Sequence, residues 1–180
     1  MDESSVSLII ASQGFQQIEY HDTKKVIAAA GFPVVTASNK SGSAIAKDGS
    51  KVPVEITLDN VEPHNYAGIF FIGGPGALEH LDNGTSYKIA QDTFYQNKPI
   101  GAICISTRIL AKSGILHDKY ATGWNDDGEL DKIFADNNVL YLPEEKVVVD
   151  GNVITATDPS VANDFGKHIV EMLQNQQQWG

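Results

Sequence analysis

The feature that most constrains this chain is the alternation of short apolar runs with segments of helical spacing. Nearly continuous apolar runs occupy residues 6–11, 68–72 and 99–104. Strands without polar alternation are covered on both faces, as in a parallel sheet that lies between two layers of helices. Segments of helical spacing, each closed by glycine or proline, follow these runs at 15–30, 87–94 and 107–113. The alternation therefore predicts an α/β domain with a mostly parallel sheet and helices on both faces.

Two further segments have the period-two pattern of hairpins. Residues 41–58 surround Asp48-Gly49, and residues 147–154 surround Asp150-Gly151, dipeptides that favour tight turns. We expect both hairpins to be additions to the parallel sheet. Further strands are expected at 33–38, 120–122 and 139–142, and helices near 130–134 and 161–173. No repeat or linker divides residues 1–180, so they are expected to form one domain with a polar C-terminal tail at 174–180.

Charge and residue content exclude several classes of function. The chain has 13 Lys and Arg against 23 Asp and Glu, a formal net charge of −10, and no basic stretch that would bind nucleic acid. Its single cysteine excludes an intrachain disulfide, and its five histidines lack metal-ligand spacing, so we expect no metal and no cofactor. No apolar run is long enough to span a membrane, and the N-terminus lacks a basic signal start. We therefore expect a cytoplasmic protein without a membrane partner.

Functional residues of an open parallel sheet gather in the loops that follow the carboxyl ends of its strands. Five such loops are predicted, at 13–14, 73–77, 104–107, 123–126 and 157–159. A pocket built from these loops would take a small-molecule substrate. They supply the candidate pocket residues Gly14, Pro75, Ser106, Trp124 and Asp158.

Cys104 is the chemically most distinctive residue of these loops. It ends a buried strand and precedes a helix, where the helix dipole and unpaired N–H groups favour a thiolate and lower the thiol pKa. An inert buried thiol is the alternative. Arg108, in the first turn after it, either attracts an anionic ligand or lies on a solvated helix face. The acidic segment 125–129 is expected to begin a helix.

Two other segments carry candidate partners of Cys104. The glycines at 73–76 allow backbone N–H groups to approach an oxyanion, although they also suit a simple turn. Glu19, near the start of the first helix, would share a proton with a thiolate if it faces the same cleft, or would be an ordinary surface residue. His21 and His80 lie nearest this edge of the sheet, and surface positions explain them equally well.

Four segments in this order resemble the ThiJ/PfpI superfamily: GFQQIE at 14–19, IFFIGGPGA at 69–77, AIC at 102–104 and VDGNVITA at 149–156. The resemblance implies a flavodoxin-like three-layer sandwich related to class I glutamine amidotransferases, assembled as a homodimer, with a reactive cysteine on a nucleophile elbow. It places Cys104 on the family's nucleophile and Glu19 on the acid that hydrogen-bonds it. Gly74 and Ile105 resemble the backbone N–H donors of the family's oxyanion hole.

The chain departs from the family pattern at two positions. The protease-like branch has a histidine directly after the cysteine, where this chain has Ile105. The parkinsonism-associated and glyoxalase-like branch has a histidine after the next strand, where this chain has Thr122-Gly123-Trp124. Neither position offers a general base, and the loss of such a group costs roughly 10²- to 10⁴-fold in rate.

Three functions follow from the resemblance. The first is a cysteine-nucleophile hydrolase or lyase of glyoxalase or deglycase type that acts on reactive carbonyls or related electrophiles, with Glu19 moving the protons. The second is a non-catalytic redox or stress-response protein in which Cys104 is oxidised to sulfenic and then sulfinic acid, held by Glu19. The third is a PfpI-like intracellular cysteine protease, for which Glu19 is a poor substitute for histidine.

Overall fold

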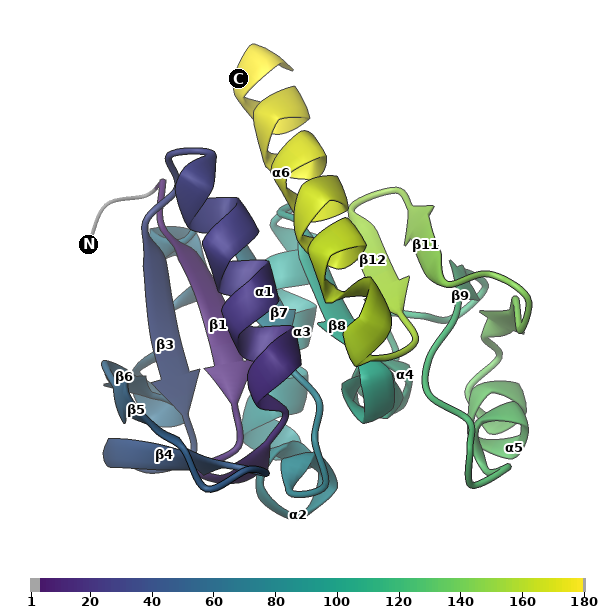
Figure 1. Cartoon of the computed structure of the whole chain (residues 1–180). Coiled ribbons are helices and arrows are strands. Elements are labelled where there is room, and N and C mark those ends of the chain that lie inside the picture. Colours follow the sequence, from purple (N-terminus) through teal and green to yellow (C-terminus); the bar gives the residue numbers. More distant parts are fainter. Residues whose placement is uncertain (1–3, 180) are drawn as a thin grey trace.

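A computed structural model describes residues 4–179 and is built around a seven-stranded sheet (Figure 1). Its strands in spatial order are β11 (Val147–Asp150), β12 (Val153–Ala156), β8 (Ile100–Ile103), β7 (Gly68–Phe71), β1 (Val6–Ile10), β3 (Val34–Ser38) and β6 (Ile56–Thr57). All neighbours pair in parallel except β11, which runs antiparallel to β12 at one edge. β1, β7 and β8 are buried throughout, as their unbroken apolar runs predict, and β12 is buried as well.

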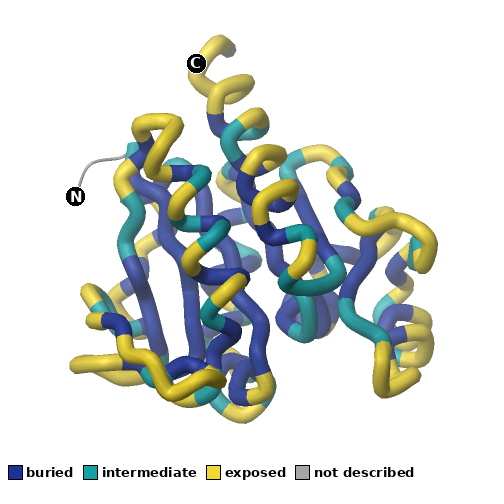
Figure 2. The backbone as a smooth tube through the Cα atoms, viewed as in Figure 1, coloured by how far each residue is buried: buried dark blue, intermediate teal, exposed yellow. Residues whose placement is uncertain are grey.

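Helices cover both faces of this sheet, as the sequence predicts. α1 (Gln17–Ala29) packs along α6 (Ala162–Trp179) on one face, and α3 (Gly84–Tyr95) packs beside α4 (Thr107–Ser113) on the other (Figure 1). Figure 2 shows buried strands in the middle layer and exposed outer sides on the helices. The remaining helices are α2 (Ala77–Leu81), α5 (Leu130–Asp136) and short 3-10 turns at Leu58–Asn60, Pro63–Asn65, Cys104–Ser106 and Pro159–Val161.

The first predicted hairpin forms, but it ends earlier than expected. β4 (Gly42–Ala46) and β5 (Lys51–Val54) pair antiparallel around Asp48-Gly49, and β2 (Gln13–Phe15) adds a third strand to this small sheet. Ile56 leaves the hairpin and pairs with Ala37 of the main sheet. β2 and β6 are too short to give a periodic signal, so their pairing is set by the neighbouring strands. A separate small sheet holds β9 (Tyr120–Ala121) and β10 (Leu140–Tyr141).

Two predictions about the C-terminal part need correction. The second hairpin forms, but its turn is Gly151-Asn152, one residue later than predicted, because Asp150 still pairs with Val153. β12 is a full member of the main sheet, paired in parallel with β8, and only β11 extends beyond it. The predicted polar tail is helical, because α6 continues past Leu173 to Trp179. The side chains of residues 174–178 are exposed, which agrees with the absence of a predicted core role. Glutamine has good helix propensity, so the helix continues without further burial.

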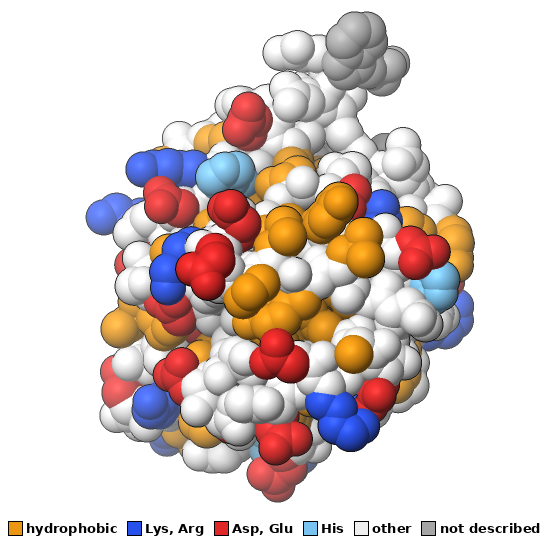
Figure 3. Space-filling model, turned by 90° about the vertical axis from the view of Figure 1, so that its right-hand side faces the viewer, with side chains coloured by type: hydrophobic (Ala, Val, Ile, Leu, Met, Phe, Trp, Pro, Cys, Tyr) orange, Lys and Arg blue, Asp and Glu red, His pale blue; other side chains and the backbone are white. Residues whose placement is uncertain are grey.

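One face of the molecule gathers exposed apolar side chains (Figure 3). Tyr120, Leu140 and Val149, from β9, β10 and β11, are among the large hydrophobic residues that are exposed. The backbone N–H of Tyr120 donates a hydrogen bond of 2.8 Å to Asp150, which ties β9 to the hairpin. A charged residue at the edge strand limits its pairing with the edge of another sheet. Within residues 4–179, no helix has the length and apolar content needed to cross a bilayer.

Close packing between β8 and β12 depends on Gly101. A Cβ on this residue would lie 2.3 Å from Ile154 Cγ2 and 2.5 Å from the Ile154 carbonyl oxygen. Because one of these atoms is backbone, a larger residue would push the two strands apart.

We therefore expect Gly101→Ala to lower the free energy of unfolding by about 1–3 kcal/mol through overpacking. Urea denaturation measures this change. Gly84→Ala is the matched control, because no atom lies within 4 Å of its added Cβ, and we expect it to stabilise by about 0.4–1 kcal/mol. Equal stability of the two variants would contradict the packing argument.

Candidate functional site

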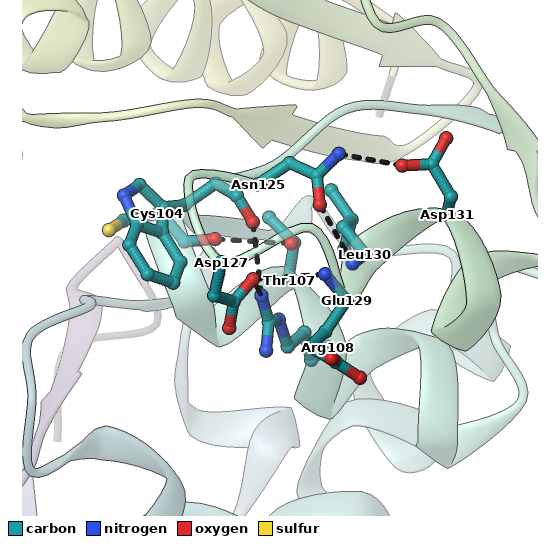
Figure 4. Close-up of polar contacts among 9 residues, drawn as sticks. Cys104, Thr107, Arg108, Asn125, Asp127, Glu129, Leu130 and Asp131 are labelled. Atoms are coloured by element: carbon teal, nitrogen blue, oxygen red, sulfur yellow. Dashed lines mark hydrogen bonds and ion pairs between the residues drawn. The ribbon is translucent and has the colours of Figure 1, made fainter.

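Cys104 lies on a strained turn between β8 and α4. Its backbone φ is +63°, a left-handed conformation that is uncommon for a residue with a side chain. Its carbonyl oxygen accepts hydrogen bonds from Thr107 Oγ1 at 3.1 Å and from the Trp124 N–H at 3.3 Å. Figure 4 shows the bond from Thr107. These two bonds hold the turn that presents the thiol at the end of the strand.

Glu19 reaches the same point from the first turn of α1. Its side chain is completely buried, and its Oε2 accepts a hydrogen bond of 2.8 Å from the Gly73 N–H at the end of β7. The carboxyl and the Cys104 thiol are close enough to shift each other's pKa. A Cβ on Gly73 would lie 2.7 Å from Cys104 Cβ and 2.8 Å from Glu19 Oε2, so only glycine fits between them. The structure thus brings the two predicted residues together.

Burial controls the protonation of both groups. It raises the pKa of the Glu19 carboxyl from 4.5 to about 7, while hydrogen bonds from Gly73 and Cys104 partly oppose this rise. The pKa of the Cys104 thiol also rises well above its ordinary value, first through burial and then through the negative charge of Glu19. The expected lowering at the helix N-terminus is therefore wrong, because the Ile105 N–H compensates only part of these effects. Burial is the largest cause of the raised pKa of Glu19.

Gly74 and Ile105 carry the two backbone N–H groups that the family resemblance suggests as oxyanion donors. The Ile105 N–H faces the Cys104 sulfur, and the Gly74 N–H has no acceptor among residues 4–179. Gly74 has a φ of +124°, and a Cβ there would lie 2.4 Å from the Gly14 carbonyl oxygen. Both residues line the cavity beside Cys104, where the sequence places oxyanion donors.

A cavity of about 610 Å³ opens beside the thiol. Of the predicted pocket residues, Pro75, Trp124 and Asp158 line it, whereas Gly14 and Ser106 do not. The Ser106 hydroxyl is buried and donates a hydrogen bond of 2.7 Å to the Ile72 carbonyl. The Gly14 carbonyl accepts a bond of 3.0 Å from the Gly76 N–H. These two residues therefore hold the loops rather than contact a ligand.

Sequence reasoning missed several residues that line the cavity. Lys47 arrives from the hairpin of β4 and β5, Tyr141 from β10 and Lys146 from the loop before β11. None of these three residues lies in a loop predicted to follow the carboxyl end of a strand, so only the tertiary fold reveals them. A larger open depression of about 760 Å³ between α6 and β11 shares no residue with the thiol site.

The structure also shows where the remaining candidate residues of the sequence lie. None of the five histidines lines the cavity, and the His21 ring packs against Tyr20 with centroids 5.0 Å apart. Residues 4–179 contain no cluster of His, Cys, Asp and Glu that could hold a metal. Arg108 is buried and pairs with Asp127 at 2.7 Å, so neither sequence interpretation of it applies (Figure 4). The predicted helix start at 125–129 is confirmed, because Asn125 Oδ1 accepts a bond from the first N–H of α5.

The match to a family model decides what kind of protein this is: the DJ-1/PfpI family model covers residues 4–172. The chain belongs to the DJ-1/PfpI family. An uncharacterized protein of Methanocaldococcus jannaschii is 32% identical over 175 residues, which cover 97% of this chain and 84% of that protein. An uncharacterized protein of Staphylococcus aureus is 30% identical, over 94% of this chain and 98% of its own length.

Solved structures of the DJ-1/PfpI type share the fold. The ThiJ/PfpI domain protein from Brachyspira murdochii superposes with a TM-score of 0.91 at 24% identity, over 97% of this chain and 99% of that chain. Toxoplasma gondii DJ-1, described as oxidized, gives a TM-score of 0.80 at 24% identity, over 97% of this chain and 92% of that chain. The flavodoxin-like sandwich expected from the sequence is confirmed.

The raised pKa of Glu19 links its protonation to folding. The folded protein holds this proton more tightly than the unfolded chain between pH 4.5 and about 7. The resulting stabilisation is complete below pH 4.5 and is lost as the pH rises through 7, with a total of up to about 3 kcal/mol.

We expect the isosteric variant Glu19→Gln, which has no proton to lose, to gain stability relative to the wild type as the pH rises from 5 to 8. Urea denaturation of both proteins across this range measures the difference, in which the contributions of other titrating groups cancel. A difference in unfolding free energy that stays constant with pH would show that Glu19 titrates normally.

Proposed function

We propose that this protein is a cysteine-dependent enzyme that acts on small reactive carbonyl compounds, in the manner of a glyoxalase or deglycase. The observation that supports this most directly is a carboxyl group with a pKa of about 7 beside a thiol that lines a cavity. A group with this pKa both accepts and donates protons efficiently near neutral pH. Glu19 therefore supplies the proton transfer that the family's histidine would otherwise provide.

The proposed first step is the addition of the Cys104 sulfur to a carbonyl carbon. The ionised Glu19 takes the thiol proton as the C–S bond forms, and the π electrons of the carbonyl move to its oxygen. The Gly74 and Ile105 N–H groups donate hydrogen bonds to that oxygen. Glu19 then returns the proton to it, which gives a neutral hemithioacetal. With a 2-oxoaldehyde, a proton shift between the two carbons and release by water yield a 2-hydroxy acid, a net addition of one water.

This mechanism has a defined dependence on pH. The base form of Glu19 increases as the pH rises through about 7, so kcat/KM for methylglyoxal or glyoxal should rise over the same range. Glu19→Gln should remove this ascending limb and lower the rate by roughly 10²-fold or more, and Cys104→Ser should abolish turnover. Steady-state assays of purified protein measure these effects. His21→Gln is the control, because His21 does not line the cavity. A profile unchanged by Glu19→Gln would reject its role as base.

A redox-sensing function is the second candidate. Glu19 Oε1 is buried and has no hydrogen-bond partner within residues 4–179, so a protonated carboxyl there could donate to an oxygen of an oxidised Cys104. Two molecules of peroxide would convert the thiol to a sulfinic acid and be reduced to water. The raised thiol pKa slows this reaction, because the thiolate is the reactive form. The same raised pKa opposes the thiolate in the carbonyl addition, but there Glu19 takes the thiol proton as the bond forms and the adjoining cavity receives the substrate. These two features make the enzyme the better supported function.

Peroxide treatment separates these two candidates. If the protein is a sensor, mild peroxide should add two oxygens to Cys104 at neutral pH, and Glu19→Gln should shorten the lifetime of that product. Intact-mass spectrometry follows the reaction, and no small carbonyl should then turn over above background. Turnover without oxidation at the same peroxide concentration would favour the enzyme.

Peptide hydrolysis, the third candidate, needs a proton donor for the leaving amine, and no histidine lines the cavity.

A homodimer, implied by the family resemblance, is retained as a proposal. Sedimentation at micromolar concentration measures it, and a monomer would exclude a catalytic residue supplied by a second subunit.

A further inference from the structure

Arg108 is a buried cation held close to the thiol site. It is the only arginine of the chain, its side chain is 4% exposed, and its guanidinium contacts Asp127 Oδ1 at 2.7 Å. The same guanidinium donates to the Trp124 carbonyl at 3.3 Å and lies 5.5 Å from the centre of the Trp124 ring. Because Arg108 follows Cys104 by one helical turn, these contacts tie the segment 124–127 to the elbow.

The backbone of Trp124 is held in place as well. Its backbone N–H donates a hydrogen bond to the Cys104 carbonyl oxygen. The preceding Gly123 packs so closely that a Cβ would lie 2.1 Å from Thr107 Oγ1. The indole is only partly exposed and lines the cavity that contains the thiol. Its position relative to Cys104 is therefore set by backbone hydrogen bonds together with the guanidinium over the ring.

The charged side chains that line the cavity sum to no net charge, and its apolar lining is partly aromatic. The charged lining side chains are two cations and two acids: Lys47, Lys146, Asp126 and Asp158. Lys146 and Asp158 also face each other at 4.0 Å. The apolar lining includes the aromatic rings of Trp124 and Tyr141 next to Pro143. A neutral ligand with a flat apolar part suits such a cavity better than a small hydrophilic one.

We propose that Trp124 determines the substrate specificity of the thiol cavity and selects neutral carbonyl compounds with an aromatic or other flat apolar group beside the reacting carbon. Arg108 and Asp127 are positioning residues that hold the indole in place. The carbonyl chemistry in this inference rests on the proposed function, but selection at the thiol does not require turnover. An aromatic contact of this kind is expected to be worth about 3- to 10-fold in rate.

Alkylation with two matched α-haloketones tests the selection directly. Phenacyl bromide and bromoacetone react with a thiol at the same type of carbon and differ in carrying an aryl or a methyl group. Their ratio of second-order rates with Cys104, divided by the ratio for N-acetylcysteine, should be about 3–10 in the wild type. Trp124→Ala should bring it to about 1, whereas Trp124→Phe should retain most of it. A wild-type ratio near 1, or a ratio unchanged in Trp124→Ala, would overturn the inference.

The positioning role has a separate control on the same helix. Arg108→Met and Asp127→Asn should each lower the ratio while the bromoacetone rate changes less than about twofold. Lys112→Met, which breaks the ion pair of α4 with Asp82 away from the cavity, should leave the ratio unchanged. If Arg108→Met does not fold, Asp127→Asn still tests the role, since its site is exposed. Ratios unchanged in both folded variants would show that Trp124 needs neither residue.

A spectroscopic signature and a turnover assay complete the test. In Trp179→Phe, which leaves Trp124 as the only tryptophan, phenacyl labelling should quench fluorescence more than labelling with bromoacetone; equal quenching would count against contact with the indole. Phenylglyoxal should exceed methylglyoxal in kcat/KM by a factor that Trp124→Ala removes. Selective alkylation without turnover would reject the proposed enzyme alone, whereas turnover without aryl preference would reject this inference alone.

Discussion

The hydrogen bond from the Gly73 N–H to Glu19 is the interaction on which the rest of the site depends. It joins the first turn of α1 to the end of β7, and the thiol of Cys104 lies beside it at the end of β8. Three elements that are far apart in sequence therefore converge on one carboxyl group. A buried carboxylate is costly unless it is hydrogen-bonded, and here one bond satisfies one oxygen while the other has no partner within residues 4–179. This incomplete compensation is why the carboxyl keeps its proton up to about pH 7.

The same burial also raises the pKa of the neighbouring Cys104 thiol. A thiol that ionises easily would react with any electrophile or oxidant that reaches it. Cys104 instead holds its proton firmly, because burial and the charge of Glu19 both oppose the thiolate, and under the proposed function Glu19 is the base that removes it. In the proposed mechanism, the reaction of Cys104 therefore depends on Glu19 and on a carbonyl group placed at the elbow. The sheet edge supplies the N–H groups, and the loop after β9 supplies the aromatic wall.

Much of this architecture is predictable from the sequence because its signals are local. Burial on both faces removes polar alternation from β1, β7 and β8, and Gly114, with a φ of +88°, marks the end of α4 as the sequence indicates. The pair of Cys104 and Glu19 is predictable from the ordered resemblance, but not from either residue alone. The direction in which the thiol pKa shifts is not predictable from the sequence, because it depends on how deeply the elbow is buried. Lys47 reaches the cavity through the pairing of β2 with β4, which no periodic pattern indicates.

The place of β12 in the main sheet has a consequence for biosynthesis. β8 ends next to Cys104 and pairs on one side with β12, about fifty residues later in the chain, and α1 packs against α6, which comes later still. When only the residues up to α5 have left the ribosome, β8, the strand before Cys104, has an unpaired edge. At that stage α1, the helix that carries Glu19, is not yet covered by α6. Such edges favour non-native association. The thiol and its carboxyl partner thus reach their final surroundings only after the hairpin and α6 have emerged from the ribosome.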